Sequence, residues 1–449
     1  MNSLRSSGLR ARGAMALFIG AALVAVTACS SLLDVKNPND VDETALDNPS
    51  GASSIANGVL AATVRMLSGT TTPYAVATDE LDWIGSRDAW NDLETGGIAN
   101  FLNEFTDGAF PYVGEARYMA DVGIGKLLAF DGAGTLVNRA DLARTYLYAA
   151  IVYASIADMY DDFAFSNKTI AKAPIGRANM SRLYDTAIVY LDRANVIANS
   201  ASGTAFTSLR YPILAYRAQV KFAKAVWTKL TPVGTALPAQ PLVTDAGAVA
   251  DANAAMALAG TTADQKFTMV DNLEATAGIN VWFEVNGRNE HKIGVAYATL
   301  DDPLTVAADT DITIKASTAA FTAFGTQSGT FTITSNRELR LILAETELLA
   351  GSTPNFTTQI NAVRALDVGK TAFAGQISNL AMLQHERKAQ LWLMRRRLMD
   401  MHRFGLKDPK WIANPNFAST FDKIGLLFPI PNVERLGNPC VNEPAGAGC

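Results

Sequence analysis

Apolar residues recur at spacings of three and four along five stretches of the chain, which predicts five amphipathic helices. In the second stretch, Tyr184, Ile188 and Leu191 share one face and Ser181 occupies the N-cap position. Glycine or proline follows several of these stretches, as is typical of helix C-termini. The predicted helices cover residues 139–163, 181–198, 208–230, 337–350 and 377–404.

The pattern changes between residues 231 and 335, where Ala, Thr, Gly and Asp dominate and apolar residues alternate over short runs. Alternation predicts strands, here over residues 292–299, 311–315 and 330–334. The helices carry many alanines on their faces, which lets paired helices approach closely as in tetratricopeptide repeats, although no clean 34-residue repeat is visible. The predicted fold class is therefore mainly α, with tetratricopeptide-like helix pairs and a loop-rich insert that contains short strands.

The N-terminus has the pattern of a secretory signal. Three arginines precede an uncharged apolar run, residues 13–28, that is too short to span a bilayer comfortably. The run ends in Val26-Thr27-Ala28-Cys29, which resembles a bacterial lipobox. We expect residues 1–28 to be removed, Cys29 to carry the lipid, residues 29–50 to form a lipid-anchored leader, and residues 51–449 to form a single domain. The alternative is an ordinary signal peptide in which Cys29 is incidental.

Composition narrows the possible partners. The 449 residues include 38 Lys and Arg against 43 Asp and Glu, a net charge of −5 that argues against nucleic acid as the main partner. Cleavage of residues 1–28 would remove three arginines and no acid, which makes the chain more acidic still. Only three His and three Cys are present, too few for most metal centres, and we expect no metal and no cofactor. Cys440 and Cys449 are left as a candidate disulfide; the alternative is two free or differently used thiols.

No catalytic motif is apparent in the sequence. His291, His385 and His402 lack the spacing of a helical zinc-protease site, and neither a Gly-x-Ser-x-Gly elbow nor a Walker-type phosphate loop occurs. Carboxylates are plentiful, but nothing singles out a glycosidase pair. The sequence favours a binding protein over an enzyme.

Two stretches combine aromatic residues with Asp, Asn and Arg, the residue types that stack on sugar rings and hydrogen-bond to their hydroxyls. The alternative is that these aromatics are core anchors beneath long loops. The candidates in the first stretch are Tyr74, Asp79, Trp83, Arg87, Trp90 and Asn91, and those in the second are Trp282, Arg288 and Tyr297.

The C-terminal third contains a distinctive set of motifs: Glu386-Arg387-Lys388, Leu391, Arg397, Asp400, Arg403 and Gly405, with Leu343-Ala344-Glu345 upstream and Phe428-Pro429-Ile430-Pro431 downstream. This set resembles the SusD/RagB family of outer-membrane nutrient-binding lipoproteins. Looser similarities to the family continue through the N-terminal half. Gln390, Met394 and Arg395 depart from the family pattern, in which Glu, Glu and Gly stand at those positions.

The resemblance implies a SusD-like helical fold and a surface-exposed, lipid-anchored outer-membrane protein that contacts the membrane through its lipid only. It implies capture of an oligosaccharide or similar nutrient, without bond cleavage, and delivery to a SusC-like TonB-dependent channel. One alternative is a scaffold lipoprotein that binds only proteins, and another is a member of the same family that serves peptide uptake.

The charged residues near the C-terminus also carry a structural prediction. Arg387 falls in the register of an apolar seam, so we expect its stem to be buried and its head group to pair with a carboxylate or with helix-end carbonyls; Glu345 and Asp400 are the candidate carboxylates. Asp400 and Arg403 lie three residues apart and should share a helix face. The alternative is that the run Arg395, Arg396 and Arg397 binds an anionic ligand or partner.

Overall fold

The computed structural model describes residues 46–167, 170–260, 262–271, 280–305, 310–323, 325–413 and 423–442. The chain divides into two units, Met1–Gly51 and Ala52–Cys449. The predicted signal peptide, Cys29 and most of the leader lie outside the described residues, and the described end of the first unit contains a 3-10 helix, η2, at Pro49–Gly51. Among the described helices, none combines the length and apolar character needed to cross a membrane.

The second unit is mainly α-helical, as predicted. Its longer helices are α2 Ala52–Ala77, α4 Glu104–Gly132, α5 Arg139–Met159, α6 Arg182–Ala198, α7 Thr204–Lys229, α8 Ala246–Ala259, α11 Ile312–Phe321, α12 Asn336–Leu349, α13 Thr353–Arg364, α14 Asn379–Gln390 and α15 Arg397–Phe404. Shorter helices are α3 Ala89–Glu94, α9 Val281–Asn286, α10 Val295–Ala298, α16 Pro409–Ala413, α18 Asn432–Gly437 and α19 Pro439–Asn442, with a 3-10 helix, η3, at Arg177–Asn179.

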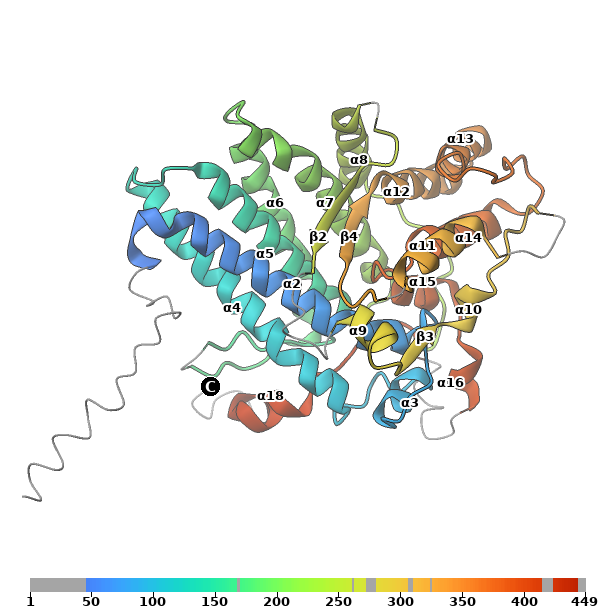
Figure 1. Cartoon of the computed structure of the whole chain (residues 1–449), viewed down its shortest axis with the longest axis horizontal. Helices are drawn as coiled ribbons and strands as arrows, with labels where there is room; N and C mark the ends of the chain where they lie inside the picture. The colour runs from blue at the N-terminus through green and yellow to red at the C-terminus, as the bar shows by residue number, and fades with distance from the viewer. Residues whose placement is uncertain are drawn as a thin grey trace, which may run out of the picture. The chain divides into compact units, whose positions relative to one another are not determined.

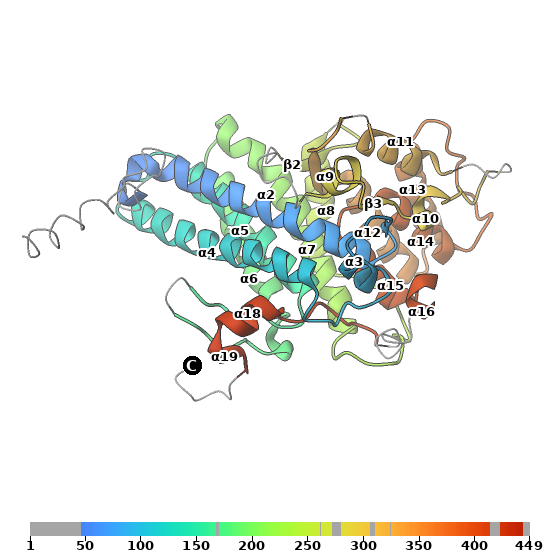
Figure 2. The same cartoon turned by 60° about the horizontal axis from the view of Figure 1, so that its bottom comes forward.

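Helices that follow one another in the chain pack side by side from α2 to α8, and α12 and α13 continue the array (Figure 1). Small residues permit this packing: Ala149, Ala150 and Ala154 of α5 are fully buried between neighbouring helices. At Gly123 of α4, a Cβ would lie only 2.8 Å from the Val59 side chain of α2. Larger residues there would push the helices apart. Figure 2 shows α18 beside α4, where the last described segment returns to the array.

The strands form two small antiparallel sheets. In the first, β1 Leu81–Trp83 pairs with β3 His291–Ile293, which aligns Trp83 with His291. In the second, β2 Lys266–Val270 pairs with β4 Thr330–Ser335, so the strand predicted over residues 330–334 is confirmed.

Two other predicted strands need correction. The strand predicted over residues 311–315 is wrong: Asp311 caps the start of α11 by accepting the Thr313 N–H at 2.8 Å, and the helix continues to Phe321. The strand predicted over residues 292–299 ends at Ile293. Gly294 then occupies the N-cap position of α10, in close contact with the backbone of Asp79: a Cβ at Gly294 would lie 2.2 Å from the Asp79 carbonyl oxygen.

The long C-terminal helix predicted over residues 377–404 is also wrong. It is two helices, α14 and α15, joined by a turn over residues 391–396 in which Leu393 (φ +57°) and Arg395 (φ +59°) adopt the left-handed conformation. Left-handed backbone cannot continue a right-handed helix, so the chain changes direction here. This turn, which we call the 391–396 turn, forms part of the candidate site.

Burial and pairing of the charged residues agree with the prediction. Arg387 is buried and donates to Asp400 at 2.8 Å. Arg403 donates to Asp400 at 2.9 Å and to Glu345 at 3.0 Å. These ion pairs join α12, α14 and α15 in the interior, so most of the charge in this region has a structural role.

Candidate functional site

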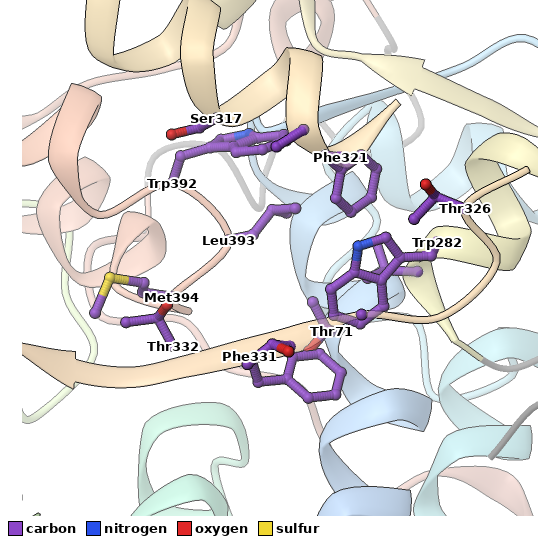
Figure 3. A pocket seen from close by; sticks show the side chains of 14 residues that line it. Thr71, Trp282, Ser317, Phe321, Thr326, Phe331, Thr332, Trp392, Leu393 and Met394 are labelled. Atoms are coloured by element: carbon purple, nitrogen blue, oxygen red, sulfur yellow. The ribbon is translucent and has the colours of Figure 1, made fainter. Parts of the chain in front are cut away.

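A cavity of about 320 Å³ lies between α9, α11, β4 and the 391–396 turn, and Thr71 of α2 also lines it. Figure 3 shows four aromatic side chains, Trp282, Phe321, Phe331 and Trp392, around the cavity. We call it the aromatic pocket. It is lined by Thr71, Val281, Trp282, Ser317, Ala320, Phe321, Thr326, Gly329, Thr330, Phe331, Thr332, Trp392, Leu393 and Met394.

The four rings hold one another in place. The Trp282 ring lies edge-on to Phe331 with centroids 4.8 Å apart, and its centroid is 5.6 Å from that of Phe321. Phe321 in turn lies edge-on to Trp392 at 5.3 Å. Gly329 lets the backbone approach the indole of Trp282, because a Cβ there would lie 2.3 Å from the ring. Such mutual packing orients the rings before any ligand arrives.

Two hydrogen bonds to Glu80 hold the 391–396 turn in place. Its carboxylate accepts the Leu393 N–H at 2.7 Å, and its backbone carbonyl oxygen lies 3.4 Å from Trp392 Nε1. Glu80 is fully buried, and burial raises its pKa to about 7. Glu80 therefore helps to hold the left-handed Leu393 through its carboxyl group and Trp392 through its backbone carbonyl.

The pocket can bind a ligand that has both flat apolar faces and hydroxyl groups. The rings provide apolar surfaces, and five hydroxyl-bearing residues line the walls between them. Sugars combine C–H faces with hydroxyls and fit this composition. The five residues are Thr71, Ser317, Thr326, Thr330 and Thr332.

Of the ligand residues predicted from the sequence, Trp282 lines the aromatic pocket, whereas three others lie in the interior. The hydroxyl of Tyr74 accepts the Leu398 N–H at 2.9 Å. Asp79 forms a two-point ion pair with Arg397, which lowers the pKa of the Asp79 carboxyl against the effect of burial. Tyr297 is 1% exposed. All three are buried in this structure, and their role as ligand contacts stays a prediction.

The remaining predicted residues gather in a second place, which we call the loop cluster: Trp83, Arg87, Trp90, Asn91 and Arg288. Pairing of β1 with β3 brings the two sequence stretches together here. Arg87 donates to Glu284 at 2.7 Å, and Arg288 donates to the same carboxylate at 3.0 Å. Both predicted stretches thus contribute to one cluster, although its arginines are already paired.

Within the loop cluster, Trp90 is buried and stacks on Phe105 with centroids 3.5 Å apart. Trp90 and Phe105 also line a smaller cavity of about 140 Å³ together with Glu284. Burial raises the pKa of the Glu284 carboxyl, while Arg87 lowers it. Trp83 is half-buried, and its indole Nε1 lies 3.4 Å from Glu290.

Sequence reasoning missed three of the four rings of the aromatic pocket. Phe331 lies on the confirmed strand, Phe321 follows a segment predicted as a strand, and Trp392 lies within the stretch predicted as one helix. Their spacing in the chain gives no sign that they meet. Only Trp282 carried a signal, as an aromatic residue in a polar, loop-like context.

One group of potential metal ligands occurs among the described residues, namely Asp302, Asp311 and His385. Positively charged side chains already pair with the two carboxylates of this group. Arg364 donates to both oxygens of Asp302, at 3.1 and 2.7 Å. Lys370 lies 3.0 Å from Asp311, whose pKa is lowered by this contact and by His385. The geometry is that of a buried ion-pair network, with the positions around the acids already taken.

Cys440 is buried and takes part in a disulfide. The predicted partner, Cys449, lies outside the described residues, as does Cys29. The pairing of Cys440 with Cys449 therefore stays a prediction.

Comparison with solved structures shows what the fold is similar to. A SusD homologue from Bacteroides thetaiotaomicron is 12% identical, with a TM-score of 0.58 over 90% of this chain and 98% of that one. A SusD superfamily protein from Bacteroides fragilis is 16% identical, with a TM-score of 0.56 over 88% and 99% of the two chains. A SusD-like carbohydrate-binding protein from Bacteroides vulgatus is 13% identical, with a TM-score of 0.55 over 88% and 97%.

Neither a family model nor a curated protein matches the sequence. The structural similarity extends over nearly the whole length of each solved chain. The protein therefore has the SusD-like fold, and the fold predicted from the sequence is confirmed.

Proposed function

We propose that this protein binds an oligosaccharide, or a nutrient of similar chemistry, in the aromatic pocket and does not cleave it. The observation that carries the proposal is the set of four pre-oriented rings around a cavity of about 320 Å³, interspersed with hydroxyl-bearing side chains. A solved protein of the same fold is described as carbohydrate-binding, which supports this choice of ligand class.

The proposal extends to location and partner. The signal-like N-terminus with its lipobox supports anchoring through Cys29 at the outer membrane, facing outwards. The resemblance to SusD/RagB proteins supports transfer of the bound nutrient to a SusC-like TonB-dependent channel. Affinity purification of the tagged lipoprotein from its native membranes, followed by mass spectrometry, tests this partner. Recovery of a large TonB-dependent barrel is the expected result, and repeated recovery without any barrel would contradict the transport role.

The binding site itself is tested by comparing two tryptophans. Trp392→Ala removes a half-buried ring of the aromatic pocket, and Trp83→Ala removes a half-buried ring of the loop cluster. Aromatic residues at the centre of a binding site typically contribute about 2 kcal/mol. We therefore expect Trp392→Ala to weaken oligosaccharide binding at least tenfold in isothermal titration calorimetry, and Trp83→Ala to change it little.

Thermal unfolding of both variants serves as the folding control. The opposite outcome, with binding lost in Trp83→Ala and kept in Trp392→Ala, would move the site to the loop cluster. Failure of the wild-type protein to bind any member of a panel that covers neutral and acidic oligosaccharides would reject the proposed function altogether.

A further inference from the structure

We propose that the natural ligand of the aromatic pocket carries an anionic group, the carboxylate or sulfate ester of an acidic oligosaccharide, and that Arg395 binds it. This inference rests on the proposed function and names the substrate class of the same pocket. It comes from the position of Arg395, from the charges around it, and from a recess that adjoins the pocket.

Arg395 occupies a backbone conformation that suits glycine. Its φ is +59°, in the left-handed region, where a residue with a side chain costs about 1–2 kcal/mol. The left-handed backbone therefore makes an arginine here unfavourable for folding alone. Strain of this kind is found most often where a side chain serves a function.

The other arginines of the same segment are neutralised, whereas Arg395 is not. Arg396 donates to Glu338 at 2.7 Å, and Arg397 pairs with Asp79. Among the described residues, no carboxylate lies within 4.0 Å of the Arg395 guanidinium. Within the part of the chain that the structure describes, its one hydrogen bond goes from Nη2 to Ser155 Oγ at 3.0 Å, and its Nη1 is buried without a hydrogen-bond partner.

One acid that acts on Arg395, Asp158, also acts on Arg396. Asp158 attracts Arg395 electrostatically, but its carboxylate accepts hydrogen bonds from the Tyr184 hydroxyl at 2.7 Å and from Trp227 Nε1 at 3.2 Å. Burial lowers the pKa of the Arg395 guanidinium, as expected for a cation removed from water without a close counter-ion. Among the described residues, the Arg395 guanidinium therefore has no carboxylate in direct contact, and an external anion would supply one.

Arg395 lies next to the aromatic pocket. It lines a recess of about 10 Å³, which has room for roughly one water molecule or one ligand oxygen. Thr71, Phe331, Thr332, Leu393 and Met394 line both the recess and the pocket. A sugar ring held among the aromatic side chains can therefore direct an anionic oxygen toward the guanidinium, where it would form a charge-assisted hydrogen bond.

The test compares each acidic probe with a neutral probe of the same shape. Calorimetry with oligogalacturonate and its methyl ester, oligomannuronate and its methyl ester, and a sulfated disaccharide and its desulfated form separates charge from stereochemistry. We expect at least one acidic probe to bind the wild-type protein ten or more times as tightly as its neutral counterpart. That preference should weaken as NaCl is raised.

Two variants connect the preference with Arg395. Arg395→Gln removes the charge, and Arg395→Gly also relieves the backbone strain, so the glycine variant should unfold at the same or a higher temperature. Both variants should bring the affinity for the acidic probe down toward that for its neutral counterpart. Arg139→Gln, which removes a half-exposed arginine of α5, should retain the wild-type preference.

The outcomes distinguish this inference from the proposed function. Binding of neutral oligosaccharides that depends on Trp392, with no preference for any acidic probe, would overturn the role of Arg395 and leave the proposed function in place. An acidic preference that persists in both Arg395 variants would also overturn it. A large drop in the unfolding temperature of Arg395→Gly would show that the arginine serves the fold instead. If no probe of either kind binds, both proposals fail together.

Discussion

Arg403 offers a sharp test of how the interior is held together. Its side chain is 1% exposed and donates to Glu345 on α12 and Asp400 on its own helix. The guanidinium also lies 4.3 Å from the Phe404 ring centroid. Arg403→Met keeps most of the apolar stem but leaves the fully buried Glu345 without its cation. Loss of one partner from a buried ion pair typically costs about 3–5 kcal/mol.

The matched control is Arg139→Met. Arg139 also makes two hydrogen bonds to one carboxylate, that of Asp131 at 2.7 and 2.9 Å, but its side chain is 49% exposed. Water and salt screen such a pair, so its loss should cost less than about 1 kcal/mol. Urea unfolding at neutral pH, followed by circular dichroism, gives the unfolding free energy of each variant.

A double variant identifies the cause. Glu345→Gln in the Arg403→Met background removes the stranded negative charge and should recover more than about 1 kcal/mol. If Arg403→Met and Arg139→Met destabilise the protein equally, or if the double variant is less stable than Arg403→Met, buried charge pairing is not what Arg403 contributes.

Two further predictions follow from burial and from backbone geometry. Burial raises the pKa of Glu80 from 4.5 to about 7, so between these values the folded state holds a proton that the unfolded state has released. As the pH rises from 4.5 to 7, the unfolding free energy should therefore fall by up to about 1.4 kcal/mol per pH unit because of this group. Urea titrations between these pH values should show that Glu80→Gln removes the fall. The same pH dependence of the unfolding free energy in the variant and the wild-type protein would contradict the shifted pKa. Gly425 and Gly134 both have left-handed backbone, but only at Gly425 would a Cβ clash with the backbone, at 2.2 Å from the Leu230 carbonyl oxygen. Gly425→Ala should therefore destabilise the protein more than Gly134→Ala does, by at least about 1 kcal/mol. Equal thermal destabilisation of the two variants would count against a close contact at Gly425.

Some helices could be predicted from the sequence and others could not. α6 has buried residues on one face and exposed residues on the other, and its predicted boundaries, like those of α12, fall within one residue of the structure. α2 is buried along nearly all of its second half, including Tyr74, so it shows no polar face and was not predicted. Its neighbour α4 was missed as well, and Pro111 within it weakens the helical pattern.

The sequence by itself determined the helical class of the protein and the pairing of Arg387 and Arg403 with Asp400. It did so because helical period and the cost of an unpaired buried charge act locally, or through residue types that the printed chain already displays. The aromatic pocket was decided by tertiary structure alone. Trp282, Phe321, Phe331 and Trp392 come from four separate elements, and Trp392 reaches the pocket only because the chain turns at Leu393, held by Glu80 more than 300 positions earlier. No spacing along the chain encodes a meeting of that kind, since it depends on how the helices pack around it.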